Sequence, residues 1–351
     1  MTLSNTLISW YTQNHRKLPW RETKDPYLVW VSEIILQQTR VDQGLAYYFR
    51  FIKAFPNLKS LSQANEDQVL KIWQGLGYYS RARNMQFAAR QIMVDHLGVF
   101  PHNYEAIIKL KGIGPYTAAA ISSISFDLPY AVVDGNVYRF LSRYYGIHQP
   151  VNSPSGKKYF AQLAQEILNM EQPATHNQAI MEFGALHCKA ANPLCNDCPF
   201  SSTCMAFEKN LVAQLPKKDK ILKIRNQHLN FFFVTKGQKF MIEKRSYAGI
   251  WKGLYQLPLI ETEEVQSLDE IIASPKYKAL FDHNEVSVKD VNQIKHKLTH
   301  RNLLINFYHL EVEHFPAGDY LMIELDEANN YAFPKPIENY LKDRSSDGGG
   351  F

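Results

Sequence analysis

The sequence has 351 residues, is 45% hydrophobic, and carries 39 basic and 34 acidic residues for a net charge of +5. This length and apolar content suffice for two domains with buried cores, and so small a net charge proves little about a nucleic-acid partner. No run of about 18 uncharged apolar residues is present, which excludes a transmembrane helix, and residues 1–11 lack the pattern of a secretory signal. We therefore expect a protein of a reducing compartment, where disulfides do not persist.

The first part of the chain, up to about residue 210, has helical periodicity. Apolar residues recur there at steps of three and four, and Gly and Pro separate the runs. The runs cover 3–12, 27–38, 43–54, 66–76, 81–97, 104–110, 116–125, 135–145 and 157–170. We predict an all-α domain over residues 1–208.

The pattern changes after a basic segment at 209–226, which we interpret either as a solvated linker or as a phosphate contact. Alternating runs at 229–235 and 239–244, joined by a three-residue turn, predict a β-hairpin. A second pair of β-like runs covers 286–299 and 302–312, with a short helix near 267–273 between the pairs. We predict a small α+β domain over 227–344 and a disordered tail over 345–351.

All four cysteines of the chain lie within residues 188–204, with intervals of six, two and five residues between them. They are Cys188, Cys195, Cys198 and Cys204. Thiolates gathered on one loop suit either zinc or a [4Fe–4S] cluster. Structural zinc sites have two closely spaced Cys pairs, and only one is present here. The wide intervals therefore favour the cluster over zinc, and over inert thiols or a disulfide.

A glycine hairpin occurs within residues 104–125, in which Gly112 and Gly114 precede Pro115. Two glycines let the backbone turn tightly and approach a ligand without an intervening Cβ, and Pro suits the first turn of a helix. The N–H groups at such a helix start form an anion site that fits a DNA phosphate. The alternative interpretation is an ordinary helical hairpin with no ligand.

Two carboxyl groups occupy contrasting positions. Glu33 is the only charge in the apolar segment 28–36, and such surroundings raise the pKa of a carboxyl group, as a general acid at neutral pH requires. The alternative for Glu33 is a buried carboxylate paired with an Arg. Asp134 precedes a helical run, which predicts a helix N-cap with a lowered pKa, and capping alone is its alternative role. One protonated and one ionised carboxyl group is the combination that glycoside cleavage uses.

The hairpin, an Asp twenty residues after Gly114 and the cysteine loop together resemble the helix–hairpin–helix DNA glycosylase superfamily. Within that superfamily, the segments 18–21 (Leu-Pro-Trp-Arg), 32–39, 75–84 and 133–137 resemble the MutY adenine glycosylases. The resemblance covers the helical domain nearly from end to end and weakens after residue 226. Residues 249–258 resemble the turn of the Nudix-like lesion-recognition domain of the same family.

The resemblance implies a monofunctional DNA N-glycosylase with a [4Fe–4S] cluster, which hydrolyses the bond between adenine and its sugar. It implies a partner of double-stranded DNA with adenine opposite 8-oxoguanine or guanine, no membrane, and a monomer in the bacterial cytoplasm at the nucleoid. Two other functions remain open. One is a bifunctional glycosylase and lyase of the thymine-glycol type, and the other is a non-catalytic iron–sulfur protein that binds damaged DNA.

Catalytic roles follow by the same resemblance. Glu33 would protonate adenine at N7, and Asp134 would stabilise the oxocarbenium-like sugar or trap it covalently. Tyr116 and Asn136 would position the sugar and the attacking water. Tyr116 stands where bifunctional relatives carry a Lys, and a phenol cannot form their Schiff base.

Further residues would bind DNA by this resemblance. The adenine pocket would be lined by Trp20, Arg21, Leu36 and Gln178. Gln38 and Tyr78 would wedge into the base stack, with Leu76 beside the damaged guanine, and the hairpin Gly112 and Gly114 would bind a phosphate. Thr299 and His300 match the lesion-reading loop of the family, although Leu298 replaces its aromatic residue.

Overall fold

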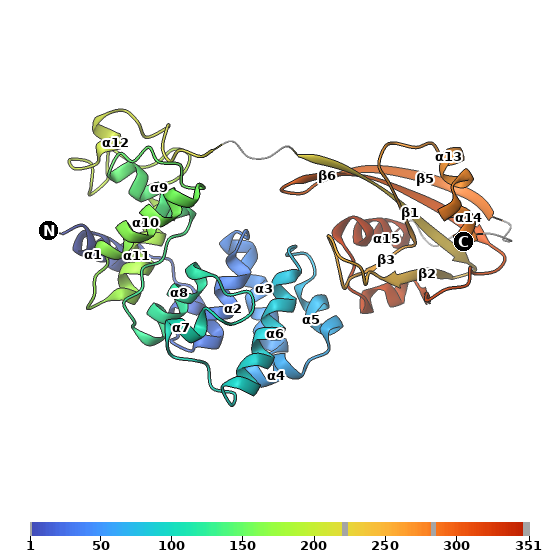
Figure 1. The fold of residues 1–351 in the computed structure, drawn as a ribbon, viewed down its shortest axis with the longest axis horizontal. Coiled ribbons are helices and arrows are strands. Elements are labelled where there is room, and N and C mark those ends of the chain that lie inside the picture. The colour runs from blue at the N-terminus through green and yellow to red at the C-terminus, as the bar shows by residue number, and fades with distance from the viewer. Residues whose placement is uncertain (1, 220–223, 282–285, 347–351) are drawn as a thin grey trace. The chain divides into compact units, whose positions relative to one another are not determined.

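The computed structural model describes residues 2–219, 224–281 and 286–346. Proximity between Cα atoms divides the chain into two compact units, each shown in Figure 1. The first unit combines Met1–Gln63 with Asn84–Lys220, and the second combines Ala64–Arg83 with Ile221–Phe351. None of the described helices is long and apolar enough to span a membrane.

The first unit is helical, as its periodicity predicts. Its helices are α1 (Leu3–Asn14), the 3-10 helix η1 (Pro19–Arg21), α2 (Pro26–Leu36), α3 (Val41–Ala54), α4 (Leu58–Gln63), most of α6 (Ser80–Asp95), α7 (Tyr104–Ile107), α8 (Pro115–Phe126), α9 (Gly135–Tyr144), α10 (Pro154–Glu166), α11 (Pro173–Leu186) and α12 (Met205–Glu208). The predicted runs omit η1, α4, α11 and α12. The omission of α11 matters because this helix forms one wall of the candidate site.

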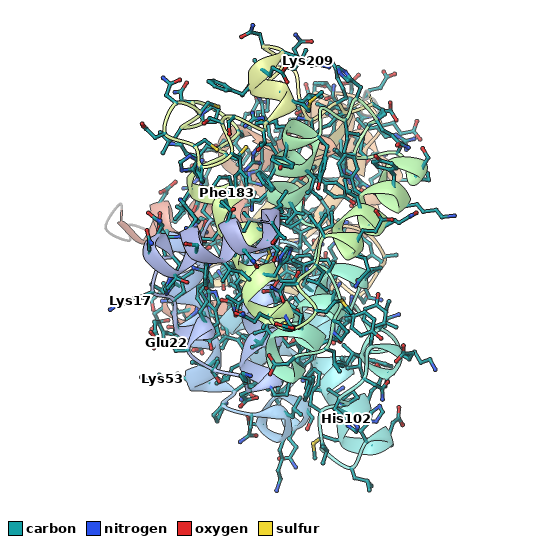
Figure 2. All side chains as sticks on the ribbon, turned by 90° about the vertical axis from the view of Figure 1, so that its left-hand side faces the viewer. Lys17, Glu22, Lys53, His102, Phe183 and Lys209 are labelled. Atoms are coloured by element: carbon teal, nitrogen blue, oxygen red, sulfur yellow. The ribbon has the colours of Figure 1, made fainter. Side chains whose placement is uncertain are left out.

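Local signals in the sequence explain where the site-forming helices begin. The Asp25 side chain accepts a hydrogen bond from the Tyr27 N–H, and Pro26 occupies the first helical position of α2. Helix α11 then packs on both α1 and α9 through aromatic side chains. Phe183 of α11, labelled in Figure 2, lies 5.2 Å from the ring of Phe140 on α9. This core holds α9 and α11 together at the end of the unit that carries the cysteines.

The second unit contains a mixed β-sheet in the order β3-β2-β1-β6-β5, with β4 beside β1 and β7 beside β2. The strands are β1 (Arg225–Lys236), β2 (Lys239–Lys244), β3 (Tyr255–Gln256), β4 (Leu259–Thr262), β5 (Val286–Lys297), β6 (Arg301–Val312) and β7 (Leu321–Glu324). The predicted hairpin of β1 and β2 is confirmed, with Thr235 opposite Phe240. The second predicted pair is also confirmed, and residues 298–300 form the turn between β5 and β6.

Helices cover both faces of this sheet. On one face, α15 (Lys335–Ser346) packs through Tyr340, whose ring stacks on Phe307 at 4.3 Å. On the other face, α13 (Leu268–Ala273) and α14 (Pro275–Phe281) pack on Phe232. The predicted α+β class is therefore confirmed for this unit. Of the predicted tail 345–351, residues 347–351 lie outside the described residues, whereas 345 and 346 end α15.

Helix α5 (Glu66–Trp73) belongs to the second unit although it lies early in the chain. The carboxylate of Asp67 accepts hydrogen bonds from Lys244 Nζ at 2.5 Å and from the Tyr255 hydroxyl at 3.2 Å. Lys71 Nζ also donates to the backbone oxygen of Tyr331 at 2.8 Å. Side-chain contacts of this kind attach the 64–83 segment to the sheet domain.

Candidate active site and cysteine cavity

A cavity of about 860 Å³ lies in the first unit, where α2, α8, α9, α11 and η1 meet. A volume of this size lies in the range of small-molecule sites and is large enough for a nucleotide. Its lining includes nine of the side chains that the sequence analysis selected: Trp20, Arg21, Glu33, Leu36, Gln38, Tyr116, Asp134, Asn136 and Gln178. Glu33 and Asp134 therefore share one space, although they are about a hundred residues apart in the sequence.

Glu33 lies in the middle of α2 and is only 8% exposed. Its neighbours Ser32 and Ile34 are also buried, so the ionised carboxylate lacks the solvation that water provides. Burial raises the pKa of Glu33 to about 7, against the opposing effects of a hydrogen bond from Tyr116 and the positive charge of Arg21. The environment that the apolar segment predicted is present, and Glu33 can hold and donate a proton near neutral pH.

Asp134 is the N-cap of α9, as predicted. Its Oδ1 accepts hydrogen bonds from the backbone N–H groups of Asn136 and Val137, each at 2.8 Å. Its Oδ2 accepts a third hydrogen bond from the Asn136 side chain at 2.7 Å. The predicted lowering of the pKa is wrong, however, because burial raises the pKa of Asp134 and the hydrogen bonds from Val137 and Asn136 only oppose that effect.

Tyr116 connects α8 to the acid on α2. Its hydroxyl donates a hydrogen bond to Glu33 Oε2 at 2.7 Å and lies 3.4 Å from the sulfur of Met181 on α11. Burial raises the pKa of Tyr116 well above its usual value, so the side chain is a neutral phenol at physiological pH. Tyr116 therefore orients Glu33 but carries no amine that could attack a sugar.

Asn136 connects Asp134 to the interior of the unit. While its Nδ2 donates to Asp134, its Oδ1 accepts a hydrogen bond from Arg139 Nη2 at 2.8 Å. Arg139 also donates to the backbone oxygens of Gly184 at 2.6 Å and Cys188 at 2.8 Å. These bonds fix the orientation of the Asn136 amide, and through it that of the carboxylate.

Four charged residues of the cavity were missed by the sequence analysis: Arg16, Arg40, Asp42 and Glu182. Glu182 lies on α11, a helix absent from the predicted runs, and its side chain is 1% exposed. It forms ion pairs with Arg16 at 2.6 Å and Arg21 at 2.7 Å. Glu182 was predictable from the sequence, because it is a single acid among the apolar residues 179–184, as Glu33 is within 28–36.

The predicted adenine-pocket residues also have defined partners in the wall. The Tyr11 hydroxyl donates a hydrogen bond to Gln178 Oε1 at 2.5 Å, which fixes the orientation of the Gln178 amide, whose nitrogen is a donor. Trp20 is 7% exposed and packs edge-on against Tyr48 at 5.1 Å. Gln38 adopts a positive φ of 61°, a costly conformation for a non-glycine residue that is frequent at functional sites.

The glycine hairpin joins α7 to α8 outside the lining of this cavity. Gly112 has a φ of +81°, and a Cβ there would meet the side chain of Asn84 at 2.6 Å. Gly114 has extended φ and ψ values, and a Cβ there would have no atom within 4 Å. The tight turn thus requires only Gly112, whereas Gly114 leaves open space before Pro115, which starts α8 as predicted.

The remaining predicted DNA contacts belong to the second unit. Tyr78 has a positive φ of 47°, is 48% exposed, and its hydroxyl lies 2.5 Å from Thr299 Oγ1, within hydrogen-bond distance. Leu76 is half-buried, and Thr299 and His300 are exposed in the turn between β5 and β6. Leu298 packs against the core of the sheet, so its replacement of an aromatic residue keeps an apolar anchor for this turn.

The four cysteines line a single small cavity at the far end of α11, together with aromatic residues including Phe140 and Phe183. All four are free thiols, and no group of three or more His, Cys, Asp or Glu side chains among the described residues is arranged to hold a metal ion. Arg143 Nη1 lies 3.5 Å from Cys188 Sγ, and the Phe200 N–H donates to Cys198 Sγ at 3.4 Å. Four cysteine sulfurs around a common cavity, with N–H donors to two of them, fit the requirements of an iron–sulfur cluster.

Family models and known proteins match both units. Residues 31–170 match the HhH-GPD superfamily of base excision DNA repair proteins, and residues 230–343 match the NUDIX domain. The chain is 39% identical over 310 residues to an adenine DNA glycosylase of Buchnera aphidicola subsp. Baizongia pistaciae (strain Bp), covering 86% of this chain and 84% of that protein. It is 35% identical to the enzyme of the same name from subsp. Schizaphis graminum (strain Sg), covering 97% of both chains.

Solved structures match the helical part. A thermostable thymine-DNA glycosylase superposes with a TM-score of 0.55 at 28% identity, covering 59% of this chain and 95% of that one. An endonuclease III bound non-covalently to DNA superposes with a TM-score of 0.52 at 19% identity, which shows a common fold. The predicted fold class of a helix–hairpin–helix domain followed by a Nudix-like domain is confirmed.

Proposed function

Because this chain belongs to the family of adenine DNA glycosylases, we propose that it removes adenine mispaired with 8-oxoguanine or guanine in duplex DNA. The observation that carries the proposal is one cavity lined by both Glu33 and Asp134. A base inside a duplex is out of reach of such a cavity, so the adenosine must first leave the stack. That step costs a few kcal/mol, and costs least at a mispair.

The chemical step follows from the states of the two carboxyl groups. With a pKa of about 7, Glu33 carries a proton for a substantial fraction of the time near neutral pH and gives it to N7 of adenine, which makes the base a neutral leaving group. Asp134 accepts three hydrogen bonds, which is the role of a carboxylate, and its charge stabilises the oxocarbenium-like sugar or traps it until water arrives. Tyr116 holds Glu33, and Asn136 holds Asp134.

We propose that the enzyme excises the base without cleaving the strand. A lyase of this superfamily uses an amine to form a Schiff base with the sugar, and Tyr116 offers only a hydroxyl group at that position. Incubating the product with and without hot alkali tests this, because a monofunctional enzyme leaves an intact abasic strand that breaks only in alkali. Strand cleavage without alkali would favour the bifunctional alternative.

Lesion reading is assigned to the second unit. Thr299 and His300 supply a hydroxyl and an imidazole for hydrogen bonds to the damaged guanine. Tyr78, adjacent to Thr299, enters the stack, and Leu76 lies beside the damaged guanine. Gln38, in the first unit, takes the second wedge position. Exposed side chains on a tight turn suit a role in contacting the edge of a base.

We propose that the four cysteines hold a [4Fe–4S] cluster. The cluster supplies structural cross-linking when bound, through ligation by Cys188, Cys195, Cys198 and Cys204. Arg143 and the Phe200 N–H would remain as hydrogen-bond donors to the ligand sulfurs. Purified protein should be yellow-brown, with absorbance in the visible region that a zinc site lacks. Colourless, zinc-loaded protein would overturn this assignment.

The decisive test of function measures adenine excision from duplexes with adenine opposite 8-oxoguanine, guanine and thymine. We expect fast excision opposite 8-oxoguanine, slower excision opposite guanine, and little opposite thymine. Equal rates on all three duplexes would contradict the proposed lesion specificity. Tight binding of damaged duplex without any excision would favour the alternative of a non-catalytic DNA-damage-binding protein.

A further inference from the structure

The cavity contains a second buried glutamate, Glu182, which the reaction described above does not use. Its two carboxylate oxygens are each bound by both neighbouring arginines. Arg16 donates from Nε at 2.9 Å and from Nη2 at 2.6 Å, and its backbone N–H adds a third bond at 2.9 Å. Arg21 donates from Nη1 at 2.9 Å and from Nη2 at 2.7 Å. Two paired, fork-like contacts on one carboxylate fix the plane of both guanidinium groups.

Within this group, Arg21 is the residue that influences Glu33 directly. Its side chain is 13% exposed, lines the cavity with Glu33, and contributes a positive charge that opposes the protonation of Glu33. Its Nη1 also donates to the backbone oxygen of Arg16 at 2.9 Å, and its guanidinium carbon lies 5.6 Å from the ring centre of Tyr11. Arg21 therefore has a well-defined position, and Glu182 accepts two of its three hydrogen bonds.

The charges that line the cavity balance when Glu33 is protonated. Among the described residues, the ionisable lining groups besides Glu33 are Arg16, Arg21 and Arg40 as cations, Asp42, Asp134 and Glu182 as anions, and Tyr116 as a neutral phenol. They come from every element around Glu33, namely the residues before α2, the start of α3, α8, α9 and α11. Without Glu182 the lining would carry one positive charge in excess, a field that favours ionised Glu33.

We propose that Glu182 is a positioning residue for adenine excision, which holds Arg21 in the cavity wall and cancels the arginine charge that would otherwise ionise Glu33. The inference rests on the proposed function, in which Glu33 donates the proton. Glu182 touches neither base nor sugar in this account, and it acts through Arg21. Its removal should change the pH at which the acid works, in addition to the rate.

The experiment measures the single-turnover excision rate from pH 5 to 9 for the intact protein and its variants. The alkaline limb of the pH–rate profile is the fall in rate as Glu33 loses its proton. In Glu182→Gln this limb should move to lower pH by about half a unit to one unit, because the excess positive charge lowers the pKa of Glu33. The loss of rate is then larger at pH 8 than at pH 6. Glu182→Asp keeps the charge and should restore the position of the limb even if its rate stays low.

A variant that shifts the charge of the lining in the opposite direction makes the test more specific. Arg16→Gln removes a cation and leaves the lining with one negative charge in excess, so its alkaline limb should move to higher pH. Arg16 is 35% exposed, so this substitution is tolerated more readily if Glu182→Gln fails to fold. The matched control is Glu261→Gln, which breaks the ion pair with Arg245 in the second unit and should leave the limb in place.

The outcomes separate this inference from the proposed function. Profiles of the Glu182 and Arg16 variants that run parallel to the wild-type profile at every pH would overturn the positioning role and leave Glu33 as the acid. Normal excision by Glu33→Gln would instead overturn the proposed mechanism itself. Limbs that move in opposite directions in the two variants would support the charge balance, since a merely structural defect lowers the rate without moving the limb.

Discussion

Two walls of one cavity each carry a buried glutamate, and the two behave in opposite ways. Glu33 on α2 has a phenol as its hydrogen-bond partner, and burial raises its pKa to about 7. Glu182 on α11 is also penalised by burial, yet hydrogen bonds from Arg16 and Arg21 bring its pKa below the ordinary range. Burial alone therefore does not make an acid. The residues that face the carboxyl group decide whether it keeps its proton.

The largest effect expected from this contrast is on the chemical step. Glu33→Gln preserves the shape of the side chain but has no proton to donate to adenine, so the excision rate should fall by about a thousandfold. Single-turnover excision from an 8-oxoguanine:adenine duplex measures this. Binding of the same duplex should be unchanged, and a variant that excises at the wild-type rate would show that Glu33 is not the acid.

Stability against pH should distinguish the two glutamates in a second way. The pKa of Glu33 is raised from 4.5 to about 7 on folding, so its protonated form stabilises the protein fully below pH 4.5, and this is lost as pH rises through 7. The loss approaches about 3 kcal/mol. Glu33→Gln avoids it and should be more stable than the wild type at pH 8 but not at pH 4.5, as urea unfolding would show.

Glu182→Gln should show the reverse behaviour in the same measurements. The folded pKa of Glu182 is lowered, so its contribution is complete above its unfolded pKa and disappears only in strong acid. Removing the charge leaves two arginines without their partner and should cost about 3 kcal/mol at both pH 6 and pH 8. If Glu182→Gln had the same free energy of unfolding as the wild type at either pH, Glu182 would not be a stabilising ionised partner of the two arginines.

Tyr116 gives a smaller test of the α2 wall. Its hydroxyl donates to Glu33 and thereby lowers the pKa of that carboxyl group. Tyr116→Phe should raise the pKa of Glu33 and move the alkaline limb of excision to higher pH by about half a unit, with a rate loss of less than about tenfold at pH 7. A limb that moves to lower pH would show that the hydrogen bond does not favour the ionised form.

The smallest effects concern the hairpin, where two residues of one type again differ by their surroundings. Gly112→Ala should destabilise the protein by about 1–2 kcal/mol because of the positive φ and the nearby Asn84. Gly114→Ala should leave stability unchanged but weaken duplex binding, measured by fluorescence anisotropy, if a phosphate approaches Pro115 closely. Wild-type affinity in Gly114→Ala would remove the hairpin from the DNA contacts.

Much of the site was predictable because local sequence controls local environment. An apolar stretch around Glu33 indicated its burial, and a polar residue before a helical run indicated that Asp134 caps α9. The predicted pKa of Asp134 was wrong because capping is a local effect, whereas the burial that raises its pKa comes from distant parts of the chain. The alternative considered for Glu33, a buried acid paired with Arg, instead describes Glu182.

The amino-acid sequence by itself determined the helical and mixed α/β parts, the turn at Gly112, the gathering of the cysteines and the types of the two candidate carboxyl groups. All of these depend on residues close together in the chain, where spacing, propensity and capping act. Only the tertiary structure decided that Glu33, Asp134 and Glu182 line one cavity, and that the 64–83 segment joins the sheet domain. Packing between distant helices sets those distances, and electrostatic energies depend on distance and burial rather than on position in the sequence.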